Sequence, residues 1–179
     1  SISPLHFYSG KTKLGRAPII YIVIVIVIMF SSRARKLLIS RSLHSSHLLS
    51  RHFTSSHGKI RVGFIGLGNM GLPMSLNLAK ETQVLAFDTN TKACYVSEEK
   101  GIGIAESVEE IGASDCHVIF SMLPGWAAVD TVMGDLMQHI PESFLSRVMV
   151  DCSTVSPSTS RRWHDTWRSQ GHAMLDAPV

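Results

Sequence analysis

The feature that most constrains this chain is a glycine-rich turn between a short apolar run and a helical pattern. Residues 60–65 predict a buried strand, and the apolar spacing that follows predicts a helix over about 69–80. Gly66, Gly68 and Gly71 lie at the junction, in the spacing G-x-G-x-x-G. The first glycine permits a tight turn, the second lets backbone approach a pyrophosphate, and the third lets the helix pack closely on the sheet. The junction therefore predicts a phosphate-binding loop for a dinucleotide, with helix N-terminal amides directed at the phosphates.

An acidic residue stands where such a loop requires one. Asp88 closes the next predicted strand, 22 positions after Gly66, and the expected offset is about 20. A carboxylate there can accept hydrogen bonds from both ribose hydroxyls of NAD and would repel the 2′-phosphate of NADP. No arginine follows it, although Lys92 could partly compensate. We therefore expect NAD rather than NADP. The candidate cofactor-binding residues of this region are Gly66, Leu67, Gly68, Asn69, Met70, Gly71 and Asp88.

Strand and helix patterns alternate through the rest of the chain. Further strands are predicted at 83–88, 102–104, 117–122, 147–151 and 173–176, and further helices at 91–100, 107–110 onward, 126–133 and 156–170. The short helix at 107 opens with a predicted capping box, Ser107 to Glu110. This order predicts an α/β fold of the Rossmann type: a doubly wound, mostly parallel sheet with helices on both faces. Ligands of such sheets bind outside the carboxyl ends of the strands, so the loops at 123–124 and 153–154 should line the same site.

Charge is distributed unevenly along the chain. Residues 1–60 contain nine Lys and Arg and no acid, whereas the remainder contains eight Lys and Arg and all fourteen acids. The net charge of +3 therefore does not describe the predicted domain, and we expect no nucleic-acid partner. The three cysteines form no paired motif and predict free thiols in a reducing compartment. No spacing of His, Cys, Asp or Glu predicts a metal site.

The basic leader divides into two parts. Residues 19–30 form a run of twelve apolar residues, which is too short for a membrane span of about 20. A signal-peptide core and a strand-forming segment are alternatives for this run. We favour a third interpretation, in which residues 1–28 precede the true start at Met29. Residues 29–58 are rich in Ser and Arg and free of acids, which predicts a transit peptide to the mitochondrial matrix, with a disordered tail as the alternative. Residues 59–179 then form the dinucleotide-binding domain.

Four segments resemble one family. Residues 62–74 (Val-Gly-Phe-Ile-Gly-Leu-Gly-Asn-Met-Gly-Leu-Pro-Met) closely resemble the signature of the β-hydroxyacid dehydrogenases. The segments 122–124, 151–157 and 175–179 recur in the same order in that family. The resemblance covers about residues 60–179. Within the family, the leader and the Phe87-Asp88 strand end look most like the mitochondrial members that oxidise 3-hydroxyisobutyrate in valine breakdown.

The resemblance implies an activity and further site residues. It implies NAD-dependent oxidation of a small 3-hydroxy acid to its semialdehyde. It also implies cofactor contacts at Leu123, Pro124 and Thr154 and a substrate-carboxylate contact at Ser153. Ala128 stands where family members often carry an asparagine that contacts the cofactor, so this contact is in question. The whole proteins of the family are expected to be homo-oligomers.

The resemblance also predicts what this chain lacks. In the family, the segment 176–179 continues into a substrate loop and a helical second domain that supplies the catalytic lysine, so that lysine is expected beyond Val179. None of the four lysines after residue 58 stands in a matching motif. We therefore expect an N-terminal fragment with no catalytic residue of its own, weak dinucleotide binding and essentially no turnover. Two alternatives are an NADPH-dependent glyoxylate or succinic semialdehyde reductase of the same family and a non-catalytic dinucleotide-binding module.

Overall fold

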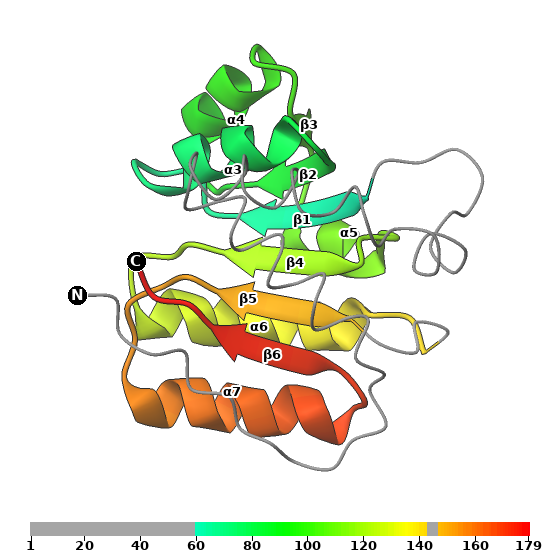
Figure 1. Ribbon diagram of the computed structural model, residues 1–179, viewed down its shortest axis with the longest axis vertical. Coiled ribbons are helices and arrows are strands. Elements are labelled where there is room, and N and C mark those ends of the chain that lie inside the picture. Colours follow the sequence, from blue (N-terminus) through cyan, green and yellow to red (C-terminus); the bar gives the residue numbers. More distant parts are fainter. Residues whose placement is uncertain (1–59, 143–146) are drawn as a thin grey trace, which may run out of the picture. The chain divides into compact units, whose positions relative to one another are not determined.

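The computed structural model describes residues 60–142 and 147–179 (Figure 1). The leader predictions for 1–28 and 29–58 fall outside the described residues. Within the described ranges, no helix has both the length and the apolar character needed to cross a bilayer.

Six parallel strands form one sheet in the order β3-β2-β1-β4-β5-β6. The strands are β1 (Arg61–Ile65), β2 (Gln83–Phe87), β3 (Gly103–Ile104), β4 (Val118–Ser121), β5 (Val148–Asp151) and β6 (Ala173–Asp176). The helices are α3 (Gly71–Ala79), α4 (Thr91–Glu98), α5 (Val108–Ala113), α6 (Trp126–His139) and α7 (Pro157–Ser169). The order and the parallel pairing confirm the predicted Rossmann-type α/β class.

Successive residues of β1 face opposite sides of the sheet. Ile65 belongs to a buried cluster with side chains of α5, α6 and α7, including Ile111, Val129 and Trp167. Phe64 faces the other side, where its ring lies against the start of α3 at Gly71. Helices thus pack on both faces of the strands, as the alternating pattern predicted (Figure 1).

Two local predictions were wrong in detail. The helix expected over 126–133 continues to His139, because its apolar spacing continues to Leu136, which is fully buried. The predicted capping box at Ser107 is incomplete. The Ser107 hydroxyl accepts from the Glu110 amide. However, Glu110 Oε2 accepts from the amide of Glu106 (2.7 Å), and not from the amide of Ser107 as a capping box requires.

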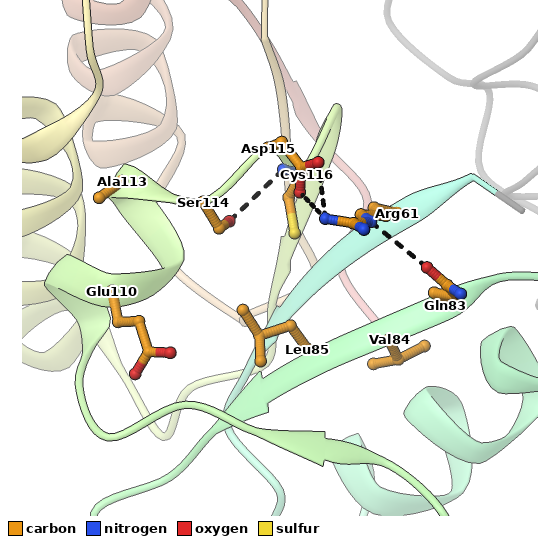
Figure 2. A pocket seen from close by; sticks show the side chains of 9 residues that line it. All are labelled: Arg61, Gln83, Val84, Leu85, Glu110, Ala113, Ser114, Asp115 and Cys116. Atoms are coloured by element: carbon orange, nitrogen blue, oxygen red, sulfur yellow. Dashed lines mark hydrogen bonds and ion pairs between the residues drawn. The ribbon is translucent and has the colours of Figure 1, made fainter. Parts of the chain in front are cut away.

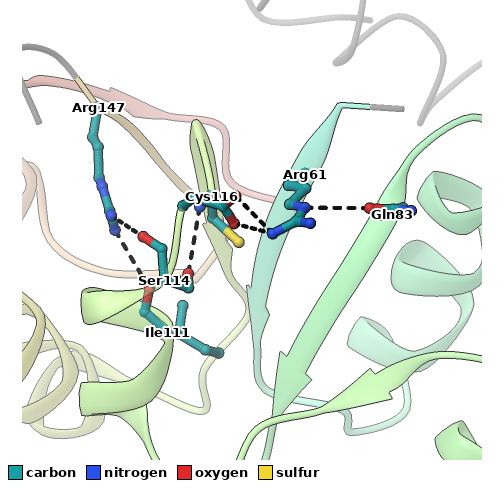
Figure 3. Close-up of polar contacts among 7 residues, drawn as sticks. Arg61, Gln83, Ile111, Ser114, Cys116 and Arg147 are labelled. Atoms are coloured by element: carbon teal, nitrogen blue, oxygen red, sulfur yellow. Dashed lines mark hydrogen bonds and ion pairs between the residues drawn. The ribbon is translucent and has the colours of Figure 1, made fainter. Parts of the chain in front are cut away.

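A buried arginine ties the sheet to a helix end. Arg147 lies just before β5 and is fully buried. Its guanidinium donates to the carbonyl oxygens of Ile111 and Ser114 at the end of α5 (Figure 3). A cation at a helix C-terminus satisfies unpaired carbonyls and complements the helix dipole. Burial lowers the pKa of the Arg147 guanidinium. The contact fixes α5 at the amino-terminal edge of the strands, opposite the glycine loop.

Candidate functional site

The order of the strands reverses between β1 and β4. From β1 the chain proceeds to β2 on one side, and from β4 it proceeds to β5 on the other. In open parallel sheets, ligands bind at such a point, outside the carboxyl ends of the strands. The glycine loop follows β1 and the segment Met122-Leu123-Pro124 follows β4, so both predicted loops meet here.

Two glycines of the loop are required by the fold, because a side chain at either position would collide with backbone. Gly66 has φ +98°, which disfavours any side chain, and a Cβ there would lie 2.2 Å from the carbonyl oxygen of Met122. A Cβ on Gly71 would lie 1.8 Å from the carbonyl oxygen of Gly66. The tight turn and the close helix packing predicted for these two positions are therefore confirmed.

Gly68 differs from its two neighbours in the motif. Its φ lies outside the left-handed region, and a Cβ there would meet nothing within 4 Å. The residue is exposed, as are Asn69 and Met70 beside it. Neither backbone strain nor packing explains a glycine here. The open space over Gly68 is what backbone contact with a ligand phosphate requires.

The helix after the loop presents free donors at the same place. Met70 is the N-cap of α3 and makes no side-chain capping bond, and the first turn carries no acidic residue. Within the described part of the chain, the amides of residues 68–70 donate no recorded hydrogen bond. Unpaired amides at a helix N-terminus, together with the helix dipole, favour an anion. The loop and the start of α3 therefore form one surface whose unpaired amides favour an anion.

Asp88 connects the end of β2 to this loop. Its Oδ2 accepts from the amide of Leu67 (2.6 Å), and its Oδ1 accepts from the amide of Asn90 (2.7 Å). The amide of Gly66 also donates to the Phe87 carbonyl (2.9 Å), so the loop is fastened to β2 by backbone as well. A carboxylate has about four acceptor positions, and Asp88 is half-buried, which leaves capacity for further donors.

The loops after β4 and β5 lie at the same edge of the sheet as the glycine loop and Asp88. The amide of Leu123 donates to the hydroxyl of Ser153 (2.9 Å). Pro124 and Thr154 are exposed beside them, while Ser153 is buried. The structure thus brings the predicted residues of four strand ends together at one edge.

The segment after β6 leaves the sheet at this same carboxyl edge. Its first amide, that of Ala177, donates to the carbonyl oxygen of Asp151 at the end of β5 (2.8 Å). Val179, beyond which the resemblance puts the catalytic lysine, follows two residues later and is 48% exposed. Because its side chain is apolar, Val179 cannot act as an acid or a base. The lysine beyond it stays a prediction.

A buried polar network underlies these loops, and sequence reasoning gave it no role. Asp151 Oδ1 accepts from the hydroxyl of Ser121 (2.8 Å) and from the amide of Ser153 (3.0 Å). The sequence offered one signal, a hydroxyl and a carboxylate that close two neighbouring apolar strands. Burial raises the pKa of the Asp151 carboxyl, although hydrogen bonds from the side chains of Ser153 and Ser121 and from the Ser153 amide act in the opposite direction.

An open cavity of about 490 Å³ lies at the opposite edge of the sheet (Figure 2). It lies near the first residues of β1 and β2, and its wall includes the exposed ion pair of Arg61 with Asp115 (2.6 Å). Arg61 lowers the pKa of the Asp115 carboxyl, and burial raises the pKa of the Cys116 thiol. Because it lies at the amino-terminal ends of the strands, this cavity is separate from the glycine loop.

The fold and the site define a dinucleotide-binding domain of the Rossmann type. Residues 61–179 match the family described as the NAD binding domain of 6-phosphogluconate dehydrogenase. The chain belongs to this family, within the β-hydroxyacid dehydrogenases that its sequence resembles.

Its relatives include several dehydrogenases of hydroxy acids. The chain is 37% identical to the NAD-dependent L-serine dehydrogenase of Pseudomonas aeruginosa over 66% of this chain and 40% of that protein. It is 34% identical to the probable mitochondrial 3-hydroxyisobutyrate dehydrogenase of Dictyostelium discoideum over 84% of this chain and 44% of that protein. Among solved structures, the Mycobacterium tuberculosis 3-hydroxyisobutyrate dehydrogenase with L-serine matches with a TM-score of 0.62 and 31% identity, over 67% of this chain and 40% of that chain. The chain thus spans less than half the length of these relatives.

The two kinds of glycine give a matched pair of variants. Gly71→Ala should lower the free energy of unfolding by about 3 kcal/mol, because its methyl group collides with backbone that cannot rotate away. Gly68→Ala should change it by less than about 0.5 kcal/mol, because its methyl group enters open space. Gly68→Ala should nevertheless weaken dinucleotide binding about tenfold or more, because the methyl group occupies the space over the loop. Urea unfolding and calorimetric titration with NADH measure the two effects.

Gly134→Ala, in the middle of α6 with open space around it, is the control for an added methyl group. Undiminished NADH affinity in a folded Gly68→Ala variant would show that no ligand approaches this backbone.

Proposed function

We propose that this chain holds NAD for the oxidation of 3-hydroxyisobutyrate to methylmalonate semialdehyde, a step of valine breakdown in the mitochondrial matrix. The observation that carries the proposal is Gly68, an open glycine in a loop whose other two glycines are fixed by packing. The relatives named 3-hydroxyisobutyrate dehydrogenase, some of them mitochondrial, support the substrate and the compartment.

Each part of the carboxyl edge has a role in this proposal. The loop of residues 66–71 holds the pyrophosphate at the start of α3, and Asp88 accepts from the ribose hydroxyls. Leu123, Pro124 and Thr154 contact the nicotinamide half of the cofactor. When bound, NAD supplies the acceptor for a hydride from the hydroxyl-bearing carbon of the substrate.

Ser153 is the proposed contact for the substrate carboxylate. Its oxygen accepts from the Leu123 amide, and its hydroxyl belongs to the loop that follows β5 at the carboxyl edge of the sheet. L-Serine, present with one solved relative, is itself a small 3-hydroxy acid. We assign no catalytic residue within this chain, since the general base of the family belongs to a further helical domain, beyond the position of Val179. In the whole protein, that domain completes the site and a homo-oligomer forms.

The leader completes the proposal. Residues 29–58 serve as the mitochondrial transit peptide, residues 1–28 precede the start at Met29, and residues 59–179 form the NAD-binding domain. The NADPH-dependent reductase of the same family is disfavoured by the negative charge of Asp88 at the end of β2. The non-catalytic module is the remaining alternative, and it predicts binding without any metabolic effect.

Removing the charge of Asp88 tests the choice of cofactor. In Asp88→Asn, the ratio of NAD affinity to NADP affinity should fall about tenfold or more, because repulsion of the 2′-phosphate is lost and ribose acceptors are weakened. Titration of both cofactors with the wild-type chain and the variant measures the ratio. Asp115→Asn, at the opposite edge of the sheet, controls for a change in net charge. If the ratio of NAD affinity to NADP affinity is the same in the wild-type chain and in Asp88→Asn, Asp88 does not contact the cofactor.

Loss of the protein from cells tests the substrate. Cells depleted of it and supplied with valine should accumulate 3-hydroxyisobutyrate, measured by mass spectrometry of extracts. Resupply of the wild-type protein should reverse the accumulation, and a Gly68→Ala version should not. Accumulation of glyoxylate or succinic semialdehyde instead would support the reductase, and no change in any of them would support the non-catalytic module.

A further inference from the structure

We infer that Asp151 is a positioning residue, which sets the loops after β4 and β5 against each other so that both can contact the nicotinamide half of the cofactor. The inference rests on the proposed function, because it assumes that these two loops contact that half. Asp151 itself touches neither cofactor nor substrate in this account.

The sheet places Asp151 beside its first partner. Ser121 and Asp151 are the last residues of β4 and β5 and face each other in the strand register. The hydroxyl of Ser121 donates to Asp151 Oδ1 (2.8 Å). Both side chains are buried, with exposed fractions of 0% and 1%. The carboxyl is thereby oriented by a residue of the neighbouring strand.

The same oxygen then fixes the next loop. Asp151 Oδ1 also accepts from the amide of Ser153 (3.0 Å), which holds the turn that leaves β5. The hydroxyl of Ser153 accepts from the amide of Leu123 in the loop after β4 (2.9 Å). The hydrogen bonds run from Ser121 through Asp151 and Ser153 to Leu123. The carboxyl of Asp151 therefore adds a side-chain link between the two loops to the backbone bond from the Cys152 amide to the Ser121 carbonyl oxygen (2.8 Å).

Stability alone does not account for a carboxyl at this position. Asp151 Oδ2 is buried and has no hydrogen-bond partner in the described portion of the chain. Asp176, its register partner on β6, adds to the effect of burial and raises the pKa of Asp151 further. An unpaired buried polar atom is costly, and an apolar side chain of similar size would avoid that cost. The geometry imposed on the two loops explains why the carboxyl is useful here.

Two ligands separate positioning from a general structural role. NADH carries the nicotinamide, whereas ADP-ribose carries the rest of the cofactor and would contact only the glycine loop and Asp88. With the 179-residue chain, Asp151→Ala should bind NADH about tenfold more weakly and ADP-ribose within about twofold of wild type. It should also lose the fluorescence enhancement of bound NADH, which reports the surroundings of the nicotinamide.

Conservative variants complete the experiment. Asp151→Asn keeps an acceptor for Ser121 and Ser153 and should restore NADH binding and fluorescence. Ser121→Ala removes one bond with little change in volume, so it should weaken NADH binding in the same direction even if Asp151→Ala does not fold. Cys152→Ala, the next buried residue, should behave as wild type.

The outcomes distinguish this inference from the proposed function. Equal losses of NADH and ADP-ribose affinity would overturn it in favour of a structural role. Unchanged NADH binding in folded Asp151→Ala and Ser121→Ala variants would also overturn it. If the wild-type chain binds neither ligand, the proposed function fails, and the inference fails with it.

Discussion

The close approach of α3 to the turn after β1 is the constraint on which the rest of the site depends. A Cβ on Gly71 would lie 1.8 Å from the carbonyl oxygen of Gly66, so this contact exists only between a glycine and backbone. It brings the start of α3 directly over the end of β1. The N-terminal amides of α3 and the open backbone of Gly68 then share one surface. An anion-binding helix end is thus a consequence of packing, before any ligand is considered.

The remaining strand ends are connected to that turn by successive polar contacts. Asp88 binds the amide of Leu67 on one side of the loop, and Gly66 packs against Met122 on the other. From there, Leu123 and Ser153 lead to the buried carboxyl of Asp151. The opposite edge of the sheet has its own contacts, centred on Arg147 and the pair of Arg61 with Asp115. The carboxyl edge can therefore be specialised for a ligand while the amino edge stabilises the fold.

Much of this arrangement could be predicted from the sequence, because it depends on local patterns. The glycine spacing, the acid at residue 88 and the alternation of strands and helices identified the fold, and the strand at 173–176 was predicted with the bounds that it has. The end of α6 was predicted too early, since the depth of burial at Leu136 depends on the packing of distant elements.

The Ser121–Asp151 pair received no role for a related reason. The two residues stand thirty positions apart, and only the register of β4 against β5 brings them together. Hydrogen-bond partners of this kind follow from tertiary structure and leave no periodic signal in the sequence. The role of Ser153 in linking two loops was hidden in the same way, although its position at the site was predicted from the resemblance.

The central claim is that a nicotinamide dinucleotide binds along the carboxyl edge of the sheet, with its pyrophosphate over Gly68. Amide chemical shifts of the ¹⁵N-labelled chain, followed by NMR during titration with NAD, test this most directly. We expect the largest shifts at residues 66–71, with smaller ones at Asp88 and in the loops at 123–124 and 153–154. Residues of the cavity at the opposite edge, such as Gln83 and Asp115, should not shift. Shifts confined to that cavity, or none in the glycine loop at saturating NAD, would contradict the account.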